Sequence, residues 1–294
     1  MQINRKLGWL RDYADIRDFS PEHSMIKPML TKIRKSPVKS IPGMPGKIDL
    51  RGLCSPVEDQ EDIGSCTANA GVALIEYFEN KAYHKFLDAS RLFLYKVTRN
   101  YLQLQGDTGA YLRSTIAAMA LFGVPPEKYW PYDTSLFDEE PPTFCYSFAQ
   151  NFKAIKYFRL DSHEHSPNEV LMRIKKFLAT GFPSMFGFTV FDSVEQSNNN
   201  DGQIPFPNPE TDRAVGGHAV AAVGYDDKKV IKNERQGKPK TTGAFLIRNS
   251  WGKDWGEDGY GWLPYDYVLK SNLASDWWTL IKQDYIDLQI FDQM

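Results

Sequence analysis

Apolar residues recur every three or four positions in four segments of the chain, which is the pattern of a helix with one buried face. The segments are the stretch from Ser65 onward and residues 90–104, 110–123 and 166–181. The last segment has a clear start, because Ser166 precedes Pro167 and Glu169 stands three positions after the serine, as in a capping box. Gly123 is a typical helix terminator at the end of the third segment.

The pattern changes in the second half, where short β-branched and aromatic runs alternate with turn residues. The runs are "PSMFGFTVF", "HAVAAVGYD" and "GAFLIRNSW". They predict mainly antiparallel strands and therefore an α+β fold. Helices first and strands later indicate two lobes, a helical lobe over roughly residues 47–150 and a β lobe over roughly 151–294. A cleft between two lobes is a common place for a ligand site.

Residues 1–46 carry no sustained apolar period, and five prolines punctuate them. We expect an extended arm rather than a lobe with its own core. Its apolar anchors are separated by charged residues, which suits a strap pinned at several points: Leu7, Trp9, Leu10, Tyr13 and Phe19.

Composition narrows the possible partners. The 294 residues are 42% hydrophobic, enough to form a large core without help from disulfides, and 35 basic against 37 acidic residues give a formal charge of -2. This balance predicts neither nucleic acid nor a membrane as a main partner. The first residues offer no apolar signal core, so a cytoplasmic location is the default expectation, with secretion by another route left open.

The three cysteines are Cys54, Cys66 and Cys145, which allow at most one internal bridge. A bridge between Cys54 and Cys145 and a pair of free thiols are equally compatible with the sequence. Cys66 on its own could be a small buried apolar residue, a disulfide partner, a metal ligand or a nucleophile. Its place after Gly64 and Ser65 favours the nucleophile, because the first turn of a helix stabilises a thiolate.

A thiolate nucleophile needs a base, and the base needs a group that orients it. His218 stands at the start of one predicted strand and Asn249 at the end of another, so two neighbouring strands could bring them together. Gln60, six residues before Cys66, could donate its amide to an oxyanion.

Three blocks of the sequence, "DQEDIGSCTANA", "GGHAVAAVGYDD" and "LIRNSWGKDWGEDGYG", resemble the signature blocks of papain-like cysteine peptidases, in the same order. The 152 positions from Cys66 to His218 (218 minus 66) are close to the spacing of about 130 to 150 in that family. The likeness covers roughly residues 47–270. The arm "GWLRDYADIRDF" is similar to that of the bacterial branch that includes xylellain.

The resemblance implies a papain-like two-lobe fold with the nucleophile on the helical lobe and the histidine and asparagine on the β lobe. Cys66 is then the nucleophile, His218 the general base and acid, and Asn249 the residue that orients the imidazole. Gln60 becomes the oxyanion donor. Trp251 would shield the His–Asn hydrogen bond from water. The chain departs from the plant and lysosomal relatives at two positions near the nucleophile, Ile63 and Thr67.

The resemblance also implies an extended peptide or protein substrate. Gly109 lies where the family pairs with the substrate backbone, and Ala110, Gly217 and Ala219 lie near its second non-primed subsite. These residues are small, which suggests room for a bulky apolar side chain. No cofactor or metal is implied, and we expect a monomer.

Several alternatives stay open at this point. Acyl transfer to an amine, as in transglutaminase-like proteins, uses similar Cys–His chemistry but usually orients the histidine with Asp. A catalytically silent binding protein on the same fold is a third possibility. The long stretch of residues 193–215 could be a loop that makes the enzyme an exopeptidase, or a simple surface excursion. His163 and His165 could bind a metal, but a solvated loop is the simpler interpretation.

The arm carries its own hypothesis. Part of it, between Phe19 and Ile41, could cover the active-site groove as a propeptide-like segment. The alternative is a strap on the back of the molecule that only stabilises the two lobes.

Overall fold

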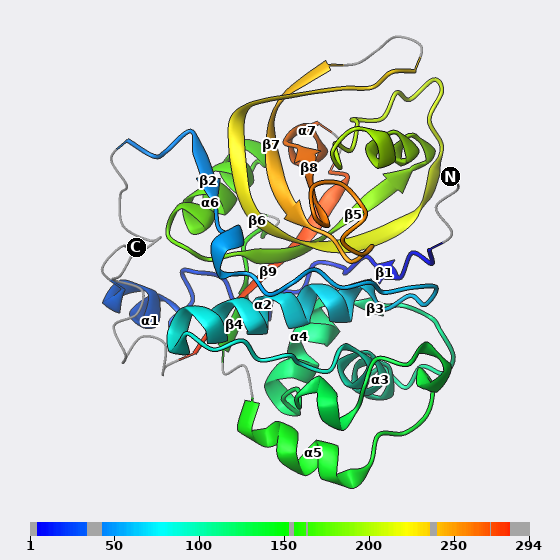
Figure 1. Ribbon diagram of the computed structural model, residues 1–294. Coiled ribbons are helices and arrows are strands. Elements are labelled where there is room, and N and C mark those ends of the chain that lie inside the picture. The colour runs from blue at the N-terminus through cyan, green and yellow to red at the C-terminus, as the bar shows by residue number, and fades with distance from the viewer. Residues whose placement is uncertain are drawn as a thin grey trace.

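The computed structural model describes residues 5–33, 43–152, 156–162, 164–235, 240–270 and 272–282. Figure 1 shows two layers, with a group of helices below, a curved sheet above, and the N-terminal arm running along the boundary between them. This is the α+β two-lobe arrangement that the sequence predicts.

The lower lobe consists of four helices: α2 (Cys66–Tyr83), α3 (Arg91–Tyr101), α4 (Leu112–Leu121) and α5 (Thr143–Ala149). The first three are the predicted ones. Gly123 follows α4 with a φ of +77°, a conformation that glycine adopts without strain. The helix α2 is buried along almost its whole length, and it contacts α3 and α4 on one side and the sheet on the other. It therefore forms the spine that joins the two lobes.

The upper lobe is a seven-stranded sheet in the order β4-β9-β5-β6-β7-β8, with β2 added on β6. Every pairing in it is antiparallel, as predicted. The strands are β2 (Lys47–Asp49), β4 (Lys156–Arg159), β5 (Ser184–Phe191), β6 (Ala214–Lys232), β7 (Lys240–Arg248), β8 (Tyr260–Pro264) and β9 (Ala274–Ile281). Because β2 belongs to this sheet, residues 47–49 lie in the β lobe and not in the helical lobe to which we assigned them.

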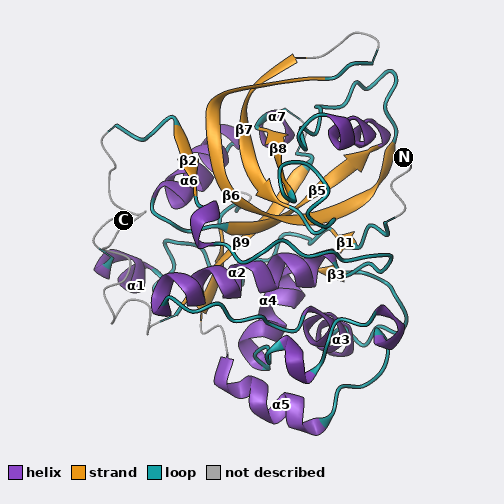
Figure 2. Cartoon of the chain, in the orientation of Figure 1, coloured by secondary structure: helices purple, strands orange, loops and turns teal. Residues whose placement is uncertain are grey.

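Two further helices, α6 (Pro167–Ala179) and α7 (Asp266–Leu269), pack with the sheet (Figure 2). The predicted capping box of α6 is present: the side chain of Ser166 accepts a hydrogen bond from the Glu169 amide, and the Glu169 carboxylate accepts one from the Ser166 amide. Short 3-10 segments connect the elements: Arg51–Leu53, Glu127–Tyr129, Thr134–Leu136, Gln150–Phe152 and Asp192–Asn199.

The arm is more structured than its sequence pattern predicts. It contains β1 (Trp9–Leu10), which pairs in parallel with β3 (Ala110–Tyr111), and a six-residue helix, α1 (Lys27–Lys32). The expectation of an irregular extended segment was wrong for α1, which forms because Leu30, with Ile26 just before the helix, is fully buried against the body of the protein. The predicted anchor Tyr13 was also wrong, since 88% of its surface is exposed.

All three cysteines are free, so the possible bridge between Cys54 and Cys145 does not form. The Cys54 thiol lies 3.6 Å from the Leu50 carbonyl, and the Cys145 thiol lies 3.5 Å from the Tyr129 carbonyl. Each sulfur has a local partner in its own lobe. In the part of the chain that the structure describes, no helix has the length and apolar character needed to cross a bilayer.

Candidate active site

Cys66 is the first residue of α2, at the interface between the lobes, and its side chain is fully buried. Ser65 occupies the N-cap position, as expected, but its side chain makes no capping bond. Its hydroxyl instead binds the Tyr132 hydroxyl at 2.7 Å and accepts a bond from the Asn69 amide at 3.0 Å. The backbone N–H groups of the first turn therefore stay available to the Cys66 sulfur, and the amides of Cys66 and Thr67 both interact with it.

His218 and Asn249 come together across β6 and β7. The Nε2 atom of His218 lies 2.8 Å from Oδ1 of Asn249, and both side chains are buried. His218 is inside β6, opposite Phe188 of β5, and Asn249 directly follows β7. The other ring nitrogen of His218, Nδ1, is buried without a hydrogen-bond partner among the residues that the structure describes. Such an orphaned nitrogen is costly in a structural histidine and useful in a proton acceptor.

Trp251 covers the His–Asn pair. Its ring stacks on the imidazole of His218 with the centroids 4.8 Å apart, and Trp255 packs edge-on against Trp251 with the centroids 5.4 Å apart. The expected role of Trp251, to shield this hydrogen bond from water, stays a prediction.

Gln60 is fully buried beside the start of α2. Ser250 fixes its amide by donating a 2.7 Å hydrogen bond to Oε1, which leaves Nε2 as the outward donor. Nε2 donates to the carbonyl of Ile63 and to that of Lys6, each at 3.0 Å. Lys6 belongs to the arm, so a backbone carbonyl of the arm occupies the donor that we expected to bind an oxyanion.

Burial sets the protonation of the two central groups. Desolvation raises the pKa of the Cys66 thiol to about 11, although the backbone amides of Ala219, Gly8, Thr67 and Cys66 lower it in part. Desolvation also lowers the pKa of His218 to about 4, while the bond to Asn249 raises it and the positive charge of Arg5 lowers it further. Both shifts favour the neutral form, a thiol at Cys66 and an uncharged imidazole at His218.

The arm lies against this group of residues. The Gly8 carbonyl accepts a 2.8 Å hydrogen bond from the Ala110 amide, and the Gly8 backbone interacts with the Cys66 sulfur. A Cβ atom added to Gly8 would stand 1.9 Å from the Gly64 carbonyl, and one added to Gly109 would stand 2.1 Å from the Gly8 carbonyl. Only glycines allow such a close approach of two backbones.

The part of the arm that lies against Cys66 is the segment around Gly8. It precedes the stretch between Phe19 and Ile41, which we expected to cover the active-site groove. The described part of that stretch lies over β4 and α6, where the Arg159 amide donates to the Phe19 carbonyl at 2.7 Å and Glu22 pairs with Arg173. Residues 34–41 lie outside the described residues.

The side chain of Trp9 fills a pocket in the β lobe next to Cys66. A Cβ atom on Gly187 would stand 1.9 Å from the indole, and one on Gly217 would stand 2.6 Å from the Trp9 carbonyl. At the inner end, the indole Nε1 donates a 3.1 Å hydrogen bond to Asp276, which is fully buried. Sequence reasoning identified Gly217 but missed Gly187 and Asp276. An isolated glycine and a lone aspartate, each inside an apolar strand, were the available signals.

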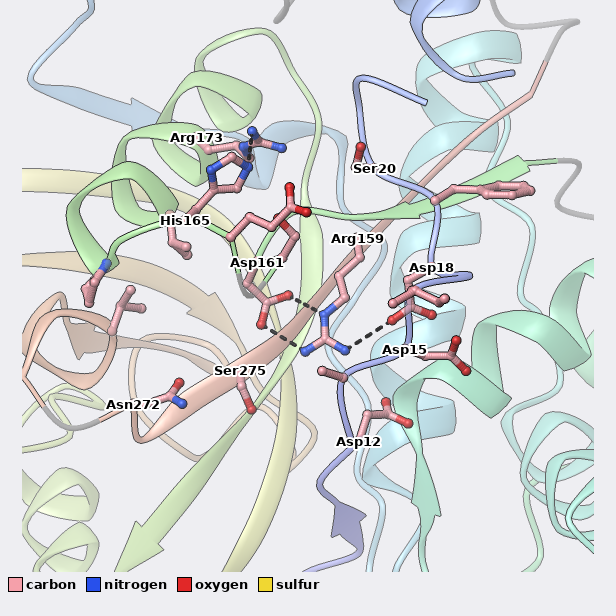
Figure 3. A pocket seen from close by; sticks show the side chains of 18 of the residues that line it. Asp12, Asp15, Asp18, Ser20, Arg159, Asp161, His165, Arg173, Asn272 and Ser275 are labelled. Atoms are coloured by element: carbon pink, nitrogen blue, oxygen red, sulfur yellow. Dashed lines mark hydrogen bonds and ion pairs between the residues drawn. The ribbon is translucent and has the colours of Figure 1, made fainter. Parts of the chain in front are cut away.

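A cluster of charges holds the arm beyond Trp9. Asp18 and Asp12 of the arm pair with Arg113, and Arg159 pairs with Asp161, Asp276 and Asp18. Figure 3 shows Arg159 between Asp161 and Asp18, at a cavity of about 790 Å³ between the arm and the β lobe. Desolvation, with the nearby charge of Asp12, raises the pKa of Asp276 to about 7. This cavity does not include Cys66 or His218 among its lining residues.

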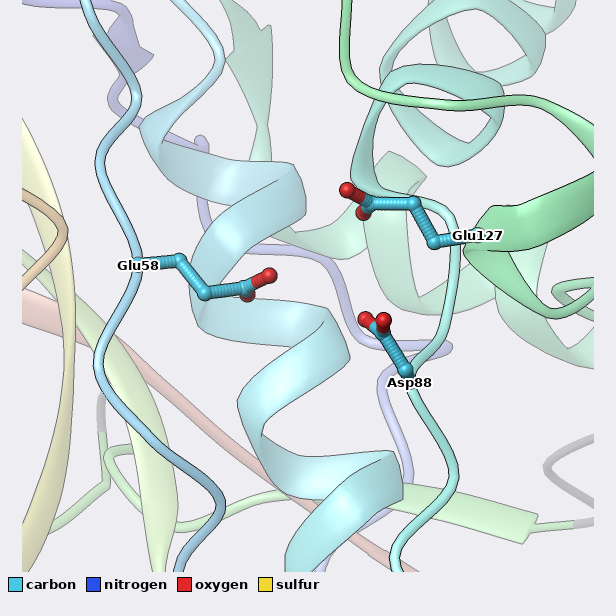
Figure 4. Close-up of side chains that lie close together, drawn as sticks. All are labelled: Glu58, Asp88 and Glu127. Carbon is cyan, nitrogen blue, oxygen red and sulfur yellow. The ribbon is translucent and has the colours of Figure 1, made fainter.

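Three carboxylates gather at the surface of the helical lobe: Glu58, Asp88 and Glu127 (Figure 4). Arg91 pairs with Glu58 at 3.0 Å and with Glu127 at 2.9 Å, and so supplies the positive charge that a metal would bring. We assign no metal to them. The other metal alternative involved two histidines, of which His163 lies outside the described residues and His165 contacts Arg173.

Comparison with known proteins identifies the family. Residues 44–277 match the model of the papain family of cysteine proteases. The chain belongs to this family. The papain-family match contains Cys66, His218, Asn249 and Gln60 and begins just before the boundary that we drew between the arm and the peptidase region.

Two relatives cover both the papain-family region and the arm. The crystal structure of xylellain, a cysteine protease from Xylella fastidiosa, superposes with a TM-score of 0.71 at 34% identity, over 95% of this chain and 97% of xylellain. An uncharacterized peptidase C1-like protein of Acanthamoeba polyphaga mimivirus is 33% identical over 95% of this chain and 87% of its own length. A more distant relative is germination-specific cysteine protease 1 of Arabidopsis thaliana, with 26% identity over 74% of this chain and 51% of its length. The protein is therefore a papain-like cysteine peptidase of the xylellain-like bacterial branch, and its substrates are peptides or proteins.

Proposed function

We propose that Cys66, His218, Asn249 and Gln60 carry out peptide-bond hydrolysis in this peptidase, and that residues 6–10 of the arm hold it in a latent state. The observation that supports the catalytic assignment best is the orientation of His218. Asn249 fixes Nε2, and Nδ1 is buried with no partner on a residue whose neighbour, Ala219, contacts the Cys66 sulfur. This is the arrangement of an oriented base beside a nucleophile.

Hydrolysis then follows in two halves. His218 takes the proton of the Cys66 thiol, and the sulfur attacks the carbonyl carbon of the substrate. The resulting oxyanion accepts hydrogen bonds from Nε2 of Gln60 and from the Cys66 amide. His218 gives its proton to the leaving amine, which leaves an acyl group on the sulfur. Water, deprotonated by His218, attacks this thioester and releases the acid and the free thiol.

Two contacts of the arm support latency. The Lys6 carbonyl occupies the Nε2 donor of Gln60, and the Gly8 backbone lies at the Cys66 sulfur. The arm also runs parallel to β3, from Cys66 toward the pocket of Trp9. A substrate would place its second residue before the scissile bond in that pocket and its scissile bond at Cys66. Its chain would therefore run in the direction opposite to that of the arm. The reversed arm presents no peptide bond in the orientation needed for attack, so it blocks the site without being cut.

The rival functions have weaker support. The partner of His218 is Asn249 and not an aspartate, which argues against the transglutaminase-like reading. A silent binding protein has no need of a buried, unpaired Nδ1 on His218. We propose a monomer, because one chain supplies every residue of this site.

The test compares the intact chain with a chain cleaved near Lys47, using a fluorogenic dipeptide and a small thiol-directed epoxide. We expect both the hydrolysis rate and the second-order labelling rate to increase on cleavage, with Cys66→Ala inactive in both forms. Equal rates in the intact and cleaved chains would exclude the arm as a block. Hydrolysis by Cys66→Ala above background would exclude Cys66 as the nucleophile.

A further inference from the structure

The pocket that holds Trp9 is built from the rigid sheet and not from the arm. Gly187 lies in β5, Gly217 in β6 and Asp276 in β9, and β5 is hydrogen-bonded to both β6 and β9. The two glycines provide flat walls on which an aromatic ring can lie, because any side chain there would collide with the indole or its backbone. The pocket therefore keeps its shape when the arm leaves.

Asp276 is held in place by a second layer of polar groups. The Asp161 carboxylate accepts hydrogen bonds from the amides of Asp276 and Trp277, at 2.8 and 2.9 Å. Arg159 pairs with Asp161 and also donates to Oδ1 of Asp276 at 2.8 Å. The backbone at Asp276 has a φ of +61°, which few side chains tolerate apart from Asn and Asp. These contacts aim the carboxylate into the pocket.

The second oxygen of Asp276 depends on the arm. Oδ2 accepts hydrogen bonds from the indole Nε1 of Trp9, at 3.1 Å, and from the amide of Asp12, at 2.9 Å. Both donors leave with the arm, while Arg159 stays on Oδ1. A buried carboxylate oxygen without a donor is costly, so the open pocket favours a side chain that returns an N–H group to Oδ2.

We propose that Asp276 is a specificity-determining residue of this peptidase and selects substrates with tryptophan as the second residue before the scissile bond. The side chain of that residue takes the place of Trp9. This inference rests on the proposed function, because it assigns the substrate side chain bound at the same site. Flat apolar walls select the ring, and Oδ2 of Asp276 selects its N–H group. Phenylalanine and leucine fit the walls but leave Oδ2 without a donor.

The test uses the full-length Trp9→Ala chain, which removes the indole from the pocket without deleting any segment, and the same variant cleaved near Lys47, in which the Asp12 amide can also leave Oδ2. Its substrates are blocked dipeptide coumarin amides of the form X-Ala, where X is Trp, benzothienylalanine, Phe or Leu. Benzothienylalanine has the shape of Trp with sulfur in place of the N–H group. We expect kcat/KM for Trp to exceed that for benzothienylalanine by about tenfold, in the range that one unsatisfied buried acceptor costs.

Adding Asp276→Asn should reduce this ratio to about one or below, because Arg159 keeps the amide oxygen and turns the NH2 group toward the ring. Asn tolerates the positive φ at this position. The matched control is Asp201→Asn, an exposed aspartate with a φ of +47°, which should leave the ratio unchanged. A second variant, Gly187→Ala, narrows the pocket and should lower kcat/KM for Trp and benzothienylalanine together by about tenfold, with less effect on Leu.

The outcomes separate the two proposals. If the Phe and Leu substrates are cleaved but kcat/KM for Trp exceeds that for benzothienylalanine by less than about threefold, the assignment of Asp276 is overturned. The peptidase mechanism is then left intact. A tenfold ratio that survives Asp276→Asn also overturns it. If neither the Trp9→Ala chain nor the same variant cleaved near Lys47 cleaves any of the substrates, the proposed function and this inference both fall.

Discussion

The Nε2 atom of Gln60 donates a 3.0 Å hydrogen bond to the backbone carbonyl of Lys6. The same donor is the one that we assign to the oxyanion of the reaction, so the arm and the transition state compete for one hydrogen bond. A donor shared in this way would link the proposed latency to catalysis.

Replacing Gln60 by Ala should therefore have two effects. In the open Trp9→Ala chain, we expect kcat to fall by about a hundredfold or more, because a donor aimed at the developing negative charge is lost. In the otherwise unmodified chain, the arm should dock less firmly. Gln150→Ala, which changes an exposed glutamine of the helical lobe, is the control. Unchanged kcat in the open Gln60→Ala chain would remove Gln60 from the mechanism.

The three other catalytic positions should differ in severity. In the Trp9→Ala chain, Cys66→Ala and His218→Ala should each lower kcat by at least about a thousandfold, because they remove the nucleophile and the base. Asn249→Ala should lower kcat less, on the order of a hundredfold, because Asn249 orients the imidazole and transfers no proton. Steady-state kinetics on a fluorogenic dipeptide gives the three values. An Asn249→Ala chain as inactive as Cys66→Ala would show that Asn249 does more than orient.

Trp9 should control access to Cys66. Trp9→Ala removes a buried ring and its bond to Asp276, and we expect the epoxide to label Cys66 at least about tenfold faster than in the unmodified chain. Trp9→Phe keeps an aromatic ring and loses the N–H group, so its labelling rate should fall between the two. Tyr13→Ala is the matched control, because this aromatic residue of the arm is 88% exposed and should not affect the rate. Equal rates for Trp9→Ala and Tyr13→Ala would contradict the docking role of Trp9.

Arm docking should respond to pH through two groups with opposite signs. Asp276 has a raised pKa of about 7 when the arm is docked, so its contribution to docking is present at low pH and is lost as the pH rises from about 4 to 7. His218 has a lowered pKa of about 4, so its contribution is present above pH 6.5 and is lost as the pH falls to about 4. The charged groups that act on them are Asp12, Arg159 and Asp161 near Asp276, and Arg5 near His218.

Docking of the arm can be measured at each pH from two labelling rates of Cys66. The rate for the Trp9→Ala chain is divided by the rate for the chain that keeps Trp9. Between about pH 4 and 7 the two contributions oppose each other, so the ratio should change little. With Asp276→Asn in both chains only His218 remains, and the ratio should rise with pH over the same range. Parallel profiles with and without Asp276→Asn would show that Asp276 does not titrate with docking.

All three thiols should be free in solution. Alkylation of the denatured, unreduced protein should add three groups, one each at Cys54, Cys66 and Cys145, as counted by mass spectrometry. Addition of a single group would indicate the bridge that the structure lacks. In the folded, arm-docked chain we expect slow modification of Cys66, because burial raises its pKa to about 11 and the thiolate is the reactive form.

The sequence by itself determined the elements whose signals are local. The apolar period gave α2, α3 and α4, and the Ser166–Glu169 capping box gave the start of α6. Three sequence blocks were enough to indicate the family, since the order of Cys66, His218 and Asn249 is a property of the chain. Where these three side chains meet depends on how the fold brings the two lobes together.

Only the tertiary structure decided where the arm docks. Trp9 and Asp276 are 267 positions apart, and no periodicity or spacing relates them. The burial of Leu30 made α1 where the prolines suggested a loop, while Tyr13, an equally apolar anchor by pattern, points to solvent. The position of the covering segment at Gly8 depends on the glycines Gly64 and Gly109 of distant loops, whose lack of side chains admits a second backbone. Local rules describe how each segment folds, but the choice among docking sites is made by steric fit and by buried hydrogen bonds between segments remote in sequence.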